Sequence, residues 1–332
     1  MQSTLNIGLI GAGRIGKIHA KNINLHPFCN LFSVTDALES AAKELAEQYN
    51  AKAIDINDVF NHDDIDALII ASPTDTHADY IELACKHNLP LLCEKPIDNE
   101  LDRAKQCIES INQHDNTCAL AFNRRHDPQF KQLKSEIENK SIGDLEILVI
   151  TSRDPSPPPV SYIKSSGGLF KDMSIHDLDI ARWMLGEKIV EVHAFGSNLV
   201  DKEIGNAGDI DTAIITLKTE SGKLCHINNS RRAVYGYDQR IEAFGSKGML
   251  QAENFRHTPL LKSTESGTAK EPLLDFFLER YEQAYINELE DFYQSITNKT
   301  PPLASPIDGL EALKLAEAAI ESCQSGQSIK LA

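Results

Sequence analysis

The sequence predicts an α/β protein: an N-terminal Rossmann-type parallel sheet, then an α+β domain with a large, mostly antiparallel open sheet. The chain has 332 residues, which is more than one hydrophobic core usually serves. Short apolar runs alternate with helix-like segments in its first third, and longer β-branched segments follow Phe122. We therefore expect two domains, residues 1–122 and 123–332.

The first domain is predicted from buried strands that alternate with helices. The expected strands are apolar runs at residues 5–10, 31–35, 67–71, 89–93 and 117–122. Helix-like stretches such as LESAAKELAEQY and HADYIELACKH lie between them. This alternation is typical of βαβ units and therefore of a parallel sheet.

The second domain is predicted from segments such as LEILVITSRD, DTAIITLKT and GKLCHINNSRRAVYG, which are separated by the turn signals SGK and GSKG. Such segments favour a largely antiparallel sheet. An amphipathic helix at about residues 304–324 closes the chain. The sequence leaves open whether this helix packs back onto the first domain.

Composition and charge exclude several classes of function. The formal net charge of −16 and the pI of about 5.1 disfavour nucleic-acid and membrane-surface binding. No apolar run approaches the length of a membrane span, and the N-terminus lacks a signal-peptide pattern. Seven cysteines without a CxxC pair indicate free thiols in a reducing cytoplasm and no metal site.

A glycine-rich turn follows the first strand directly and opens a helix. In GAGRIG, one glycine suits a tight turn, one suits close approach to a pyrophosphate, and one suits helix–strand packing. The pyrophosphate would lie on the N–H groups at the helix N-terminus. The expected cofactor-binding residues here are Gly11, Gly13, Arg14, Ile15 and Gly16.

Asp36 ends the second strand, where a dinucleotide site carries an acidic residue. Its carboxylate would accept hydrogen bonds from the ribose hydroxyls and repel a 2′-phosphate, which favours NAD over NADP. The alternative role for Asp36 is to cap the N-terminus of the helix that follows it.

Polar residues also follow the later strands, and ligands of an open parallel sheet bind at these carboxyl ends. Lys95, in Glu94-Lys95-Pro96, is expected to point into the cleft, and its bond to Pro96 is a candidate cis peptide. His77 is expected to be structural or cofactor-lining, with Thr74 or Asp75 capping its helix. The further cofactor-binding candidates are Ser72, Thr74, His77, Glu94 and Lys95.

The segment GGLFKDMSIHDLDIARWMLG is predicted to be one helix that opens at Gly167 and ends at Gly186. Its apolar residues surround most of the circumference, which is typical of a buried helix. Asp172, His176 and Asp179 nevertheless lie on one face. We interpret this edge as one wall of a cleft. For Asp179, the alternative is a pair with Arg182 on the surface of the helix.

These motifs resemble the glucose–fructose oxidoreductase/inositol dehydrogenase family over almost the whole chain, with the greatest likeness to its inositol dehydrogenases. GAGRIGKIHAKN, SPTDTH, EKP, FNRRHDP, SRDPSPPP, the GG…D…HD helix and NNSRRAVYGYDQR carry the resemblance. It implies a Rossmann domain, a second domain whose sheet assembles a homotetramer, and NAD-dependent oxidation of myo-inositol at C2. The family's catalytic trio matches Lys95, Asp172 and His176.

The resemblance also makes Arg125, Asp154 and Tyr235 candidates for substrate binding, beside Asp172 and His176. His126 departs from the family pattern, where an aromatic residue is expected, and a solvated loop histidine is its default role. The preferred inositol isomer or sugar stays open. Two competing functions are a redox-assisted glycosidase of the same fold and a non-catalytic NAD-binding sensor, which would lack Lys95 or His176.

Overall fold

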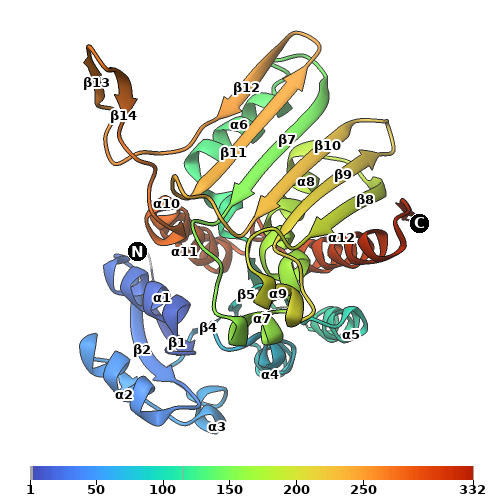
Figure 1. Cartoon of the computed structure of the whole chain (residues 1–332). Coiled ribbons are helices and arrows are strands. Elements are labelled where there is room, and N and C mark those ends of the chain that lie inside the picture. The colour runs from blue at the N-terminus through green and yellow to red at the C-terminus, as the bar shows by residue number, and fades with distance from the viewer. Residues whose placement is uncertain (1–2, 115, 332) are drawn as a thin grey trace. The chain divides into compact units, whose positions relative to one another are not determined.

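The computed structural model describes residues 3–114 and 116–331, with side chains except those of residues 164 and 165. The chain divides into two compact units, shown together in Figure 1. The first comprises residues 1–126 and 284–313, and the second comprises 127–283 and 314–332. The first unit thus continues past residue 122 and includes a segment that the sequence prediction placed in the second domain.

The first unit contains a six-stranded parallel sheet in the order β3-β2-β1-β4-β5-β6. The strand order reverses between β1 and β4, as in dinucleotide-binding folds. The predicted parallel sheet is confirmed. Its strands are β1 (Leu5–Ile10), β2 (Cys29–Thr35), β3 (Lys52–Ala53), β4 (Ala67–Ile70), β5 (Leu91–Glu94) and β6 (Cys118–Ala121).

Amphipathic helices connect these strands. In α5, for example, Ala104, Cys107, Ile108 and Ile111 are buried at the spacing of one helix face. The helices are α1 (Arg14–Leu25), α2 (Glu39–Gln48), α3 (Ile56–Val59), α4 (His77–Lys86) and α5 (Leu101–Ile111), with short 3₁₀ turns η1 (Thr74–Thr76) and η2 (Asn123–His126).

Helix α11 (Glu282–Asn298) supplies apolar side chains to the core of the first unit. Leu289, Phe292 and Tyr293 pack with the buried residues of β1 and β2, and the Tyr293 hydroxyl donates to the Ser3 carbonyl oxygen at 3.0 Å. Helix α12 (Pro306–Ser325) corresponds to the predicted closing helix, and it begins in the first unit and ends in the second.

The second unit contains a seven-stranded sheet in the order β12-β11-β7-β10-β9-β8-β15. Every neighbouring pair is antiparallel except β7 and β10, which confirms a mostly antiparallel sheet. A separate hairpin of β13 (Leu261–Thr264) and β14 (Gly267–Lys270) projects from it (Figure 1). The sheet strands are β7 (Leu145–Arg153), β8 (Ile189–Ser197), β9 (Thr212–Thr219), β10 (Leu224–Ser230), β11 (Asp238–Gly245), β12 (Gly248–Ala252) and β15 (Ile329–Lys330).

Helices cover one face of this sheet, where α8 contacts β7 and α6 contacts β12 (Figure 1). Along β10, Cys225, Ile227 and Asn229 are buried while Leu224 is exposed, so alternate side chains face the helices. The helical segments are α6 (Pro128–Glu138), α7 (Val160–Ser166), η3 (Phe170–Ser174), α8 (Ile175–Leu185), α9 (Lys202–Asn206) and α10 (Phe277–Arg280).

The single helix predicted from Gly167 to Gly186 is wrong at its start. Gly167 and Gly168 both have φ near +82°, and Gly167 ends α7. A π-helical turn, η3, follows and leads into α8. Gly186 does end α8 in the left-handed conformation. The wider π turn changes the angular positions of the side chains before His176.

All seven cysteines are free thiols, and all are buried except Cys323, which is half-buried. Among the residues that the structure describes, no helix is both long enough and apolar enough to cross a lipid bilayer.

Candidate active site

The glycine turn after β1 has the geometry of a phosphate-binding loop. Gly11 has φ +108°, and a Cβ there would lie 2.4 Å from the Ala71 carbonyl oxygen. A Cβ at Gly16 would lie 1.9 Å from the Gly11 carbonyl oxygen. No atom lies within 4 Å of a Cβ built on Gly13, and no side chain caps α1 at this position. The turn is therefore tight at two glycines and open at the third, which suits a pyrophosphate above α1.

Asp36 braces this turn from the end of β2. Its Oδ2 accepts a hydrogen bond of 2.7 Å from the Ala12 N–H, and its Oδ1 accepts one of 2.8 Å from the Leu38 N–H. Leu38, not Asp36, is the N-cap of α2. Each carboxylate oxygen has a further lone pair. Asp36 can therefore accept ribose hydroxyls while it holds the turn, and the residues present fit a dinucleotide.

His77 joins the ends of β4 and β5. Its Nδ1 lies 2.7 Å from the Pro96 carbonyl oxygen and its Nε2 lies 2.9 Å from the Ser72 carbonyl oxygen. The ring is buried, so it acts as a structural brace below the strand ends. The expected capping by Thr74 or Asp75 is wrong, because Thr76 is the N-cap of α4 and makes no side-chain cap bond.

The Glu94-Lys95-Pro96 turn follows β5 as predicted, and the Lys95–Pro96 peptide is cis. Glu94 Oε1 lies 2.9 Å from Nε2 of His19, a buried residue of α1. Lys95 is half-buried. Sequence reasoning did not assign His19, although it lies within the GAGRIGKIHAKN motif.

In the second unit, Asp172 lies on the π turn η3 and His176 on the first turn of α8. The Tyr162 hydroxyl donates to Asp172 Oδ1 at 2.9 Å. The terminal nitrogens of Arg231 each lie 3.4 Å from Asp172 Oδ2. Both carboxylate oxygens are therefore held, and the imidazole of His176 follows on the next turn.

A buried polar network fastens this helical segment to the sheet. Ser174 Oγ donates to Asn229 Oδ1 at 2.7 Å, and Asn229 Nδ2 donates to Asp177 Oδ2 at 2.8 Å. All three side chains are buried. Asp179 is fully buried as well, so it does not lie at the solvated surface of α8.

Arg125 and His126 are buried in the first unit. The Arg125 guanidinium donates to the Leu303 carbonyl oxygen at 2.9 Å and pairs with Asp308 at 3.1 Å. These contacts give Arg125 a structural role at the start of α12. The default of a solvated loop histidine is wrong for His126, whose carbonyl oxygen also accepts from Asn287 at 3.0 Å.

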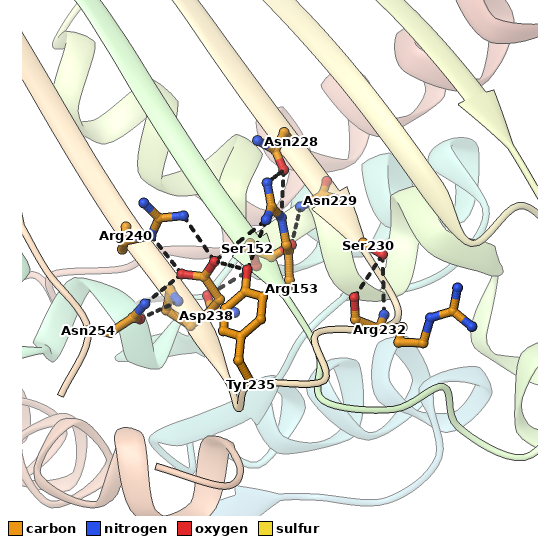
Figure 2. A network of polar contacts seen from close by, with 11 residues as sticks. Ser152, Arg153, Asn228, Asn229, Ser230, Arg232, Tyr235, Asp238, Arg240 and Asn254 are labelled. Atoms are coloured by element: carbon orange, nitrogen blue, oxygen red, sulfur yellow. Dashed lines mark hydrogen bonds and ion pairs between the residues drawn. The ribbon is translucent and has the colours of Figure 1, made fainter. Parts of the chain in front are cut away.

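Tyr235 belongs to a polar network that Figure 2 shows around Asp238. Its hydroxyl donates to Asp238 Oδ2 at 2.6 Å and accepts from Arg153 at 2.9 Å. Arg153 is paired with Asp238 across β7 and β11, on the sheet face opposite to the Ser152–Asn229 side that holds α8. Asp154, half-buried, donates its N–H to the Ser230 carbonyl oxygen at 2.9 Å.

The environment of Asp238 sets two pKa values. Burial alone would raise the pKa of Asp238, but hydrogen bonds from Arg240, Tyr235 and Asn254 outweigh it and hold that pKa below its ordinary value. Burial and the bond to Asp238 raise the pKa of the Tyr235 hydroxyl. Tyr235, Asp238, Arg240 and Asn254 are among the residues that line an open groove of about 800 Å³. Neither Asp172 nor His176 lines this groove.

The sequence reasoning did not identify Tyr162, Asn229 and Arg231. A usable signal existed for two of them. Cys225 and Ile227 are apolar and alternate along β10, so Asn229 and Arg231 share their buried face. Tyr162 had no such signal, because its contact with Asp172 depends on the path of the loop before α7.

A parallel sheet with a phosphate-binding glycine turn, together with an Asp–His pair on a second unit, defines a dinucleotide-dependent oxidoreductase. Residues 5–122 match the oxidoreductase family with an NAD-binding Rossmann fold, and residues 130–251 match the GFO/IDH/MocA C-terminal domain. The chain belongs to the GFO/IDH/MocA family of oxidoreductases, and its cofactor is NAD.

Individual relatives match over nearly the whole chain. An inositol 2-dehydrogenase of Rhizobium meliloti is 46% identical over 99% of this chain and 100% of its own length. The crystal structure of a myo-inositol dehydrogenase from Corynebacterium glutamicum has a TM-score of 0.96 at 46% identity, covering 99% of both chains. A scyllo-inositol dehydrogenase from Lactobacillus casei, with bound NAD(H) and scyllo-inositol, has a TM-score of 0.92 at 30% identity, again covering 99% of both.

Proposed function

We propose that the protein is an inositol 2-dehydrogenase that oxidises myo-inositol at C2 to 2-keto-myo-inositol with NAD. In this proposal the first unit binds the cofactor and the second binds the substrate and assembles the oligomer. The relatives from Rhizobium meliloti and Corynebacterium glutamicum, each 46% identical, support the substrate class.

The observation that carries the proposal is the pairing of Asp172 and His176 on successive turns, with the Asp172 carboxylate held by Tyr162 and Arg231. A fixed carboxylate can hold one hydroxyl of a polyol ring. An imidazole on the next turn can then reach a neighbouring hydroxyl, and imidazole takes protons near neutral pH.

Oxidation of a secondary alcohol removes a hydride from carbon and a proton from oxygen. NAD, when bound, supplies the hydride acceptor. His176 takes the hydroxyl proton as general base. Lys95, as an ammonium group, donates a hydrogen bond to the same oxygen and stabilises its developing negative charge. Asp172 orients the ring through an adjacent hydroxyl.

Initial-rate kinetics test this proposal. The purified protein is assayed at the reduced-nicotinamide absorbance band with myo-, scyllo- and chiro-inositol and with aldoses, each with NAD and with NADP. We expect NADH with myo-inositol and a ketone product detectable by mass spectrometry. Absence of NADH with every inositol isomer would refute the proposal. Turnover of an aldose alone would instead identify the protein as an aldose dehydrogenase.

A second candidate is oxidation of scyllo-inositol. The Lactobacillus casei structure contains that isomer, and its fold matches this chain with a TM-score of 0.92. Myo- and scyllo-inositol differ in the configuration at one carbon, so the ratio of kcat/KM for the two isomers decides between the candidates.

A homotetramer built through the open face of the second sheet is also proposed. The register aligns Leu224, Ile147, Phe244 and Met249 in one row across β10, β7, β11 and β12. These side chains are 40–49% exposed, and a row of exposed apolar residues is typical of an interface between subunits. Light scattering after gel filtration tests this: Phe244→Glu should dissociate the assembly, whereas Leu25→Glu, in the first unit, should not.

We propose a cytoplasmic location, because the six buried thiols and the half-buried Cys323 are all reduced. Cell fractionation with a soluble cytoplasmic marker tests it.

A further inference from the structure

Arg231 lies directly after β10 and is among the largest fully buried side chains of the described residues, at 2% exposure. A buried guanidinium is costly to desolvate and is retained only with carboxylate partners in good geometry. Its neighbour Arg232 is exposed and donates to the Leu199 and Val200 carbonyl oxygens. Two adjacent arginines therefore have different environments.

The guanidinium of Arg231 is flanked by two carboxylates. Its terminal nitrogens straddle Asp172 Oδ2 at 3.4 Å, and one of them lies 3.9 Å from Asp209 Oδ2. The side chains of Asp172 and Asp209 are each 14% exposed. Without the cation, two largely buried negative charges would share one site, which disfavours their common ionisation.

Asp209 connects this site to the start of the π turn. Its Oδ1 accepts a hydrogen bond of 3.1 Å from the Leu169 N–H. The same oxygen lies 2.7 Å from the position that a Cβ on Gly168 would occupy, and Gly168 has φ +82°. Only glycine combines that backbone conformation with room for Asp209. Gly168 is therefore required by the carboxylate that balances Arg231.

We propose that Arg231 is a positioning residue for the oxidation reaction: it fixes the Asp172 carboxylate in the direction that receives a substrate hydroxyl. Asp209 holds both Arg231 and the backbone directly before η3 in place, and Gly168 leaves room for the Asp209 carboxylate. This inference rests on the proposed function in taking Asp172 as a substrate-binding group. It assigns no contact between Arg231 and the substrate.

Loss of Arg231 should impair the binding and oxidation of the polyol and leave the binding of NAD unchanged. Misplacement of a group that orients a reactant weakens binding and slows the reaction even when the chemistry is intact. The glycine turn and Asp36 belong to the first unit, so NAD affinity should not depend on Arg231. A split between polyol kinetics and NAD binding therefore distinguishes positioning from general destabilisation.

The test compares R231M, R231K and the control R232M in the full-length protein. We expect R231M to lower kcat/KM for the polyol about 10- to 100-fold, mainly through KM, because a charged hydrogen-bond partner is lost. R231K should recover part of this loss, since lysine restores the positive charge but lacks the planar guanidinium with its two terminal nitrogens. R232M should stay within about twofold of wild type. The dissociation constant for NAD, from fluorescence titration, should be unchanged in all three.

A charge-balanced double variant, R231M/D209N, separates positioning from folding. It removes one cation and one anion, so the site keeps its net charge, and thermal stability lost in R231M should be recovered. If Arg231 positions Asp172, KM for the polyol stays raised in this variant. Recovery of wild-type KM together with stability would overturn the inference, as would wild-type kinetics in R231M.

The wild-type protein separates this inference from the proposed function. If it forms no NADH with any inositol, the proposed function fails. A crystal structure of R231M or of the double variant then decides the inference without turnover. A changed side-chain direction of Asp172 supports positioning by Arg231, and an unchanged direction overturns it.

Discussion

The imidazole Nε2 of His19 lies 2.9 Å from Glu94 Oε1, which ties the helix after the glycine turn to the strand end that precedes Lys95. His19 is buried and its ring also meets Tyr285 edge-on at 6.1 Å. One side-chain contact therefore connects the helix that follows the glycine turn with the strand end that precedes Lys95.

We expect H19A to lower kcat/KM with respect to NAD about tenfold, because loss of a buried hydrogen-bond partner leaves the Glu94 carboxylate unsatisfied. H19Q, which can still reach Glu94, should recover most of the loss. The control is H26A, which breaks the similar 2.8 Å contact between His26 and Glu290 just after the other end of α1. Equal losses in H19A and H26A would contradict a local effect on the strand ends.

We predict that H176A lowers kcat about 10²- to 10⁴-fold, the range for removal of a general base. NAD should still bind to this variant, because the glycine turn lies in the first unit. Steady-state kinetics and fluorescence titration of NAD measure the two effects. The control H257A replaces an exposed histidine. Near-normal turnover by H176A would remove His176 as the base.

D36N should shift cofactor preference toward NADP. The substitution keeps one oxygen for the Ala12 N–H but removes the negative charge that repels a 2′-phosphate. We expect the ratio of kcat/KM for NAD over NADP to fall about 10- to 100-fold, as for loss of a charged hydrogen-bond partner. The exposed Asp63 supplies the control D63N. An unchanged ratio in D36N would show that Asp36 does not select the cofactor.

Glu288, on α11, gives a stability prediction with a definite sign. Desolvation, with repulsion from Glu94 and Asp291, raises the pKa of Glu288 well above 4.5. Such a group favours folding when protonated, and its contribution is lost as the pH rises through the folded-state pKa. E288Q should therefore gain stability relative to wild type as the pH rises from about 5 to about 8. Calorimetric melting over this range measures the difference.

The control, E290Q, lies two residues further along the same helix, and its stability difference from wild type should not change over this pH range. A hydrogen bond from Gln294 lowers the pKa of Glu290 against desolvation, and His26 adds to this effect. The Glu290 carboxylate therefore contributes stability above its unfolded-state pKa, and this contribution is lost only as the pH falls below about 4.5. The stability difference between E290Q and wild type should therefore stay constant from about pH 5 to about pH 8. Parallel pH dependence in the two variants would contradict the assignment.

Alkylation of the native protein should modify Cys323 first. It is the half-buried thiol among the seven, and the other six are buried. Burial raises the pKa of Cys29 and of Cys107 to about 12, so little reactive thiolate is present at neutral pH. Mass spectrometry after brief iodoacetamide treatment should locate one label, which C323S removes. Early labelling of Cys29 or Cys107 would indicate local opening of the first unit.

Local pattern was sufficient for much of the first unit. The strand predicted at 5–10 coincides with β1, and the glycine turn, Asp36 and the Lys95 turn all follow strands as predicted. These features depend on residues close in sequence: an apolar run, glycines at fixed spacing, and a polar residue where the run ends. The sequence by itself therefore determined the parallel sheet and the cofactor class.

Other features depended on contacts between distant segments, which periodicity does not encode. The parallel pairing of β7 with β10 and the packing of α11 in the first core are such contacts. The placement of Arg231 against Asp172 is another, and so is the hydrogen bond from the Leu169 N–H, directly before η3, to Asp209. Only the tertiary structure decided these, because a buried charge or an unusual turn is stable only when its partner, far along the chain, is in place.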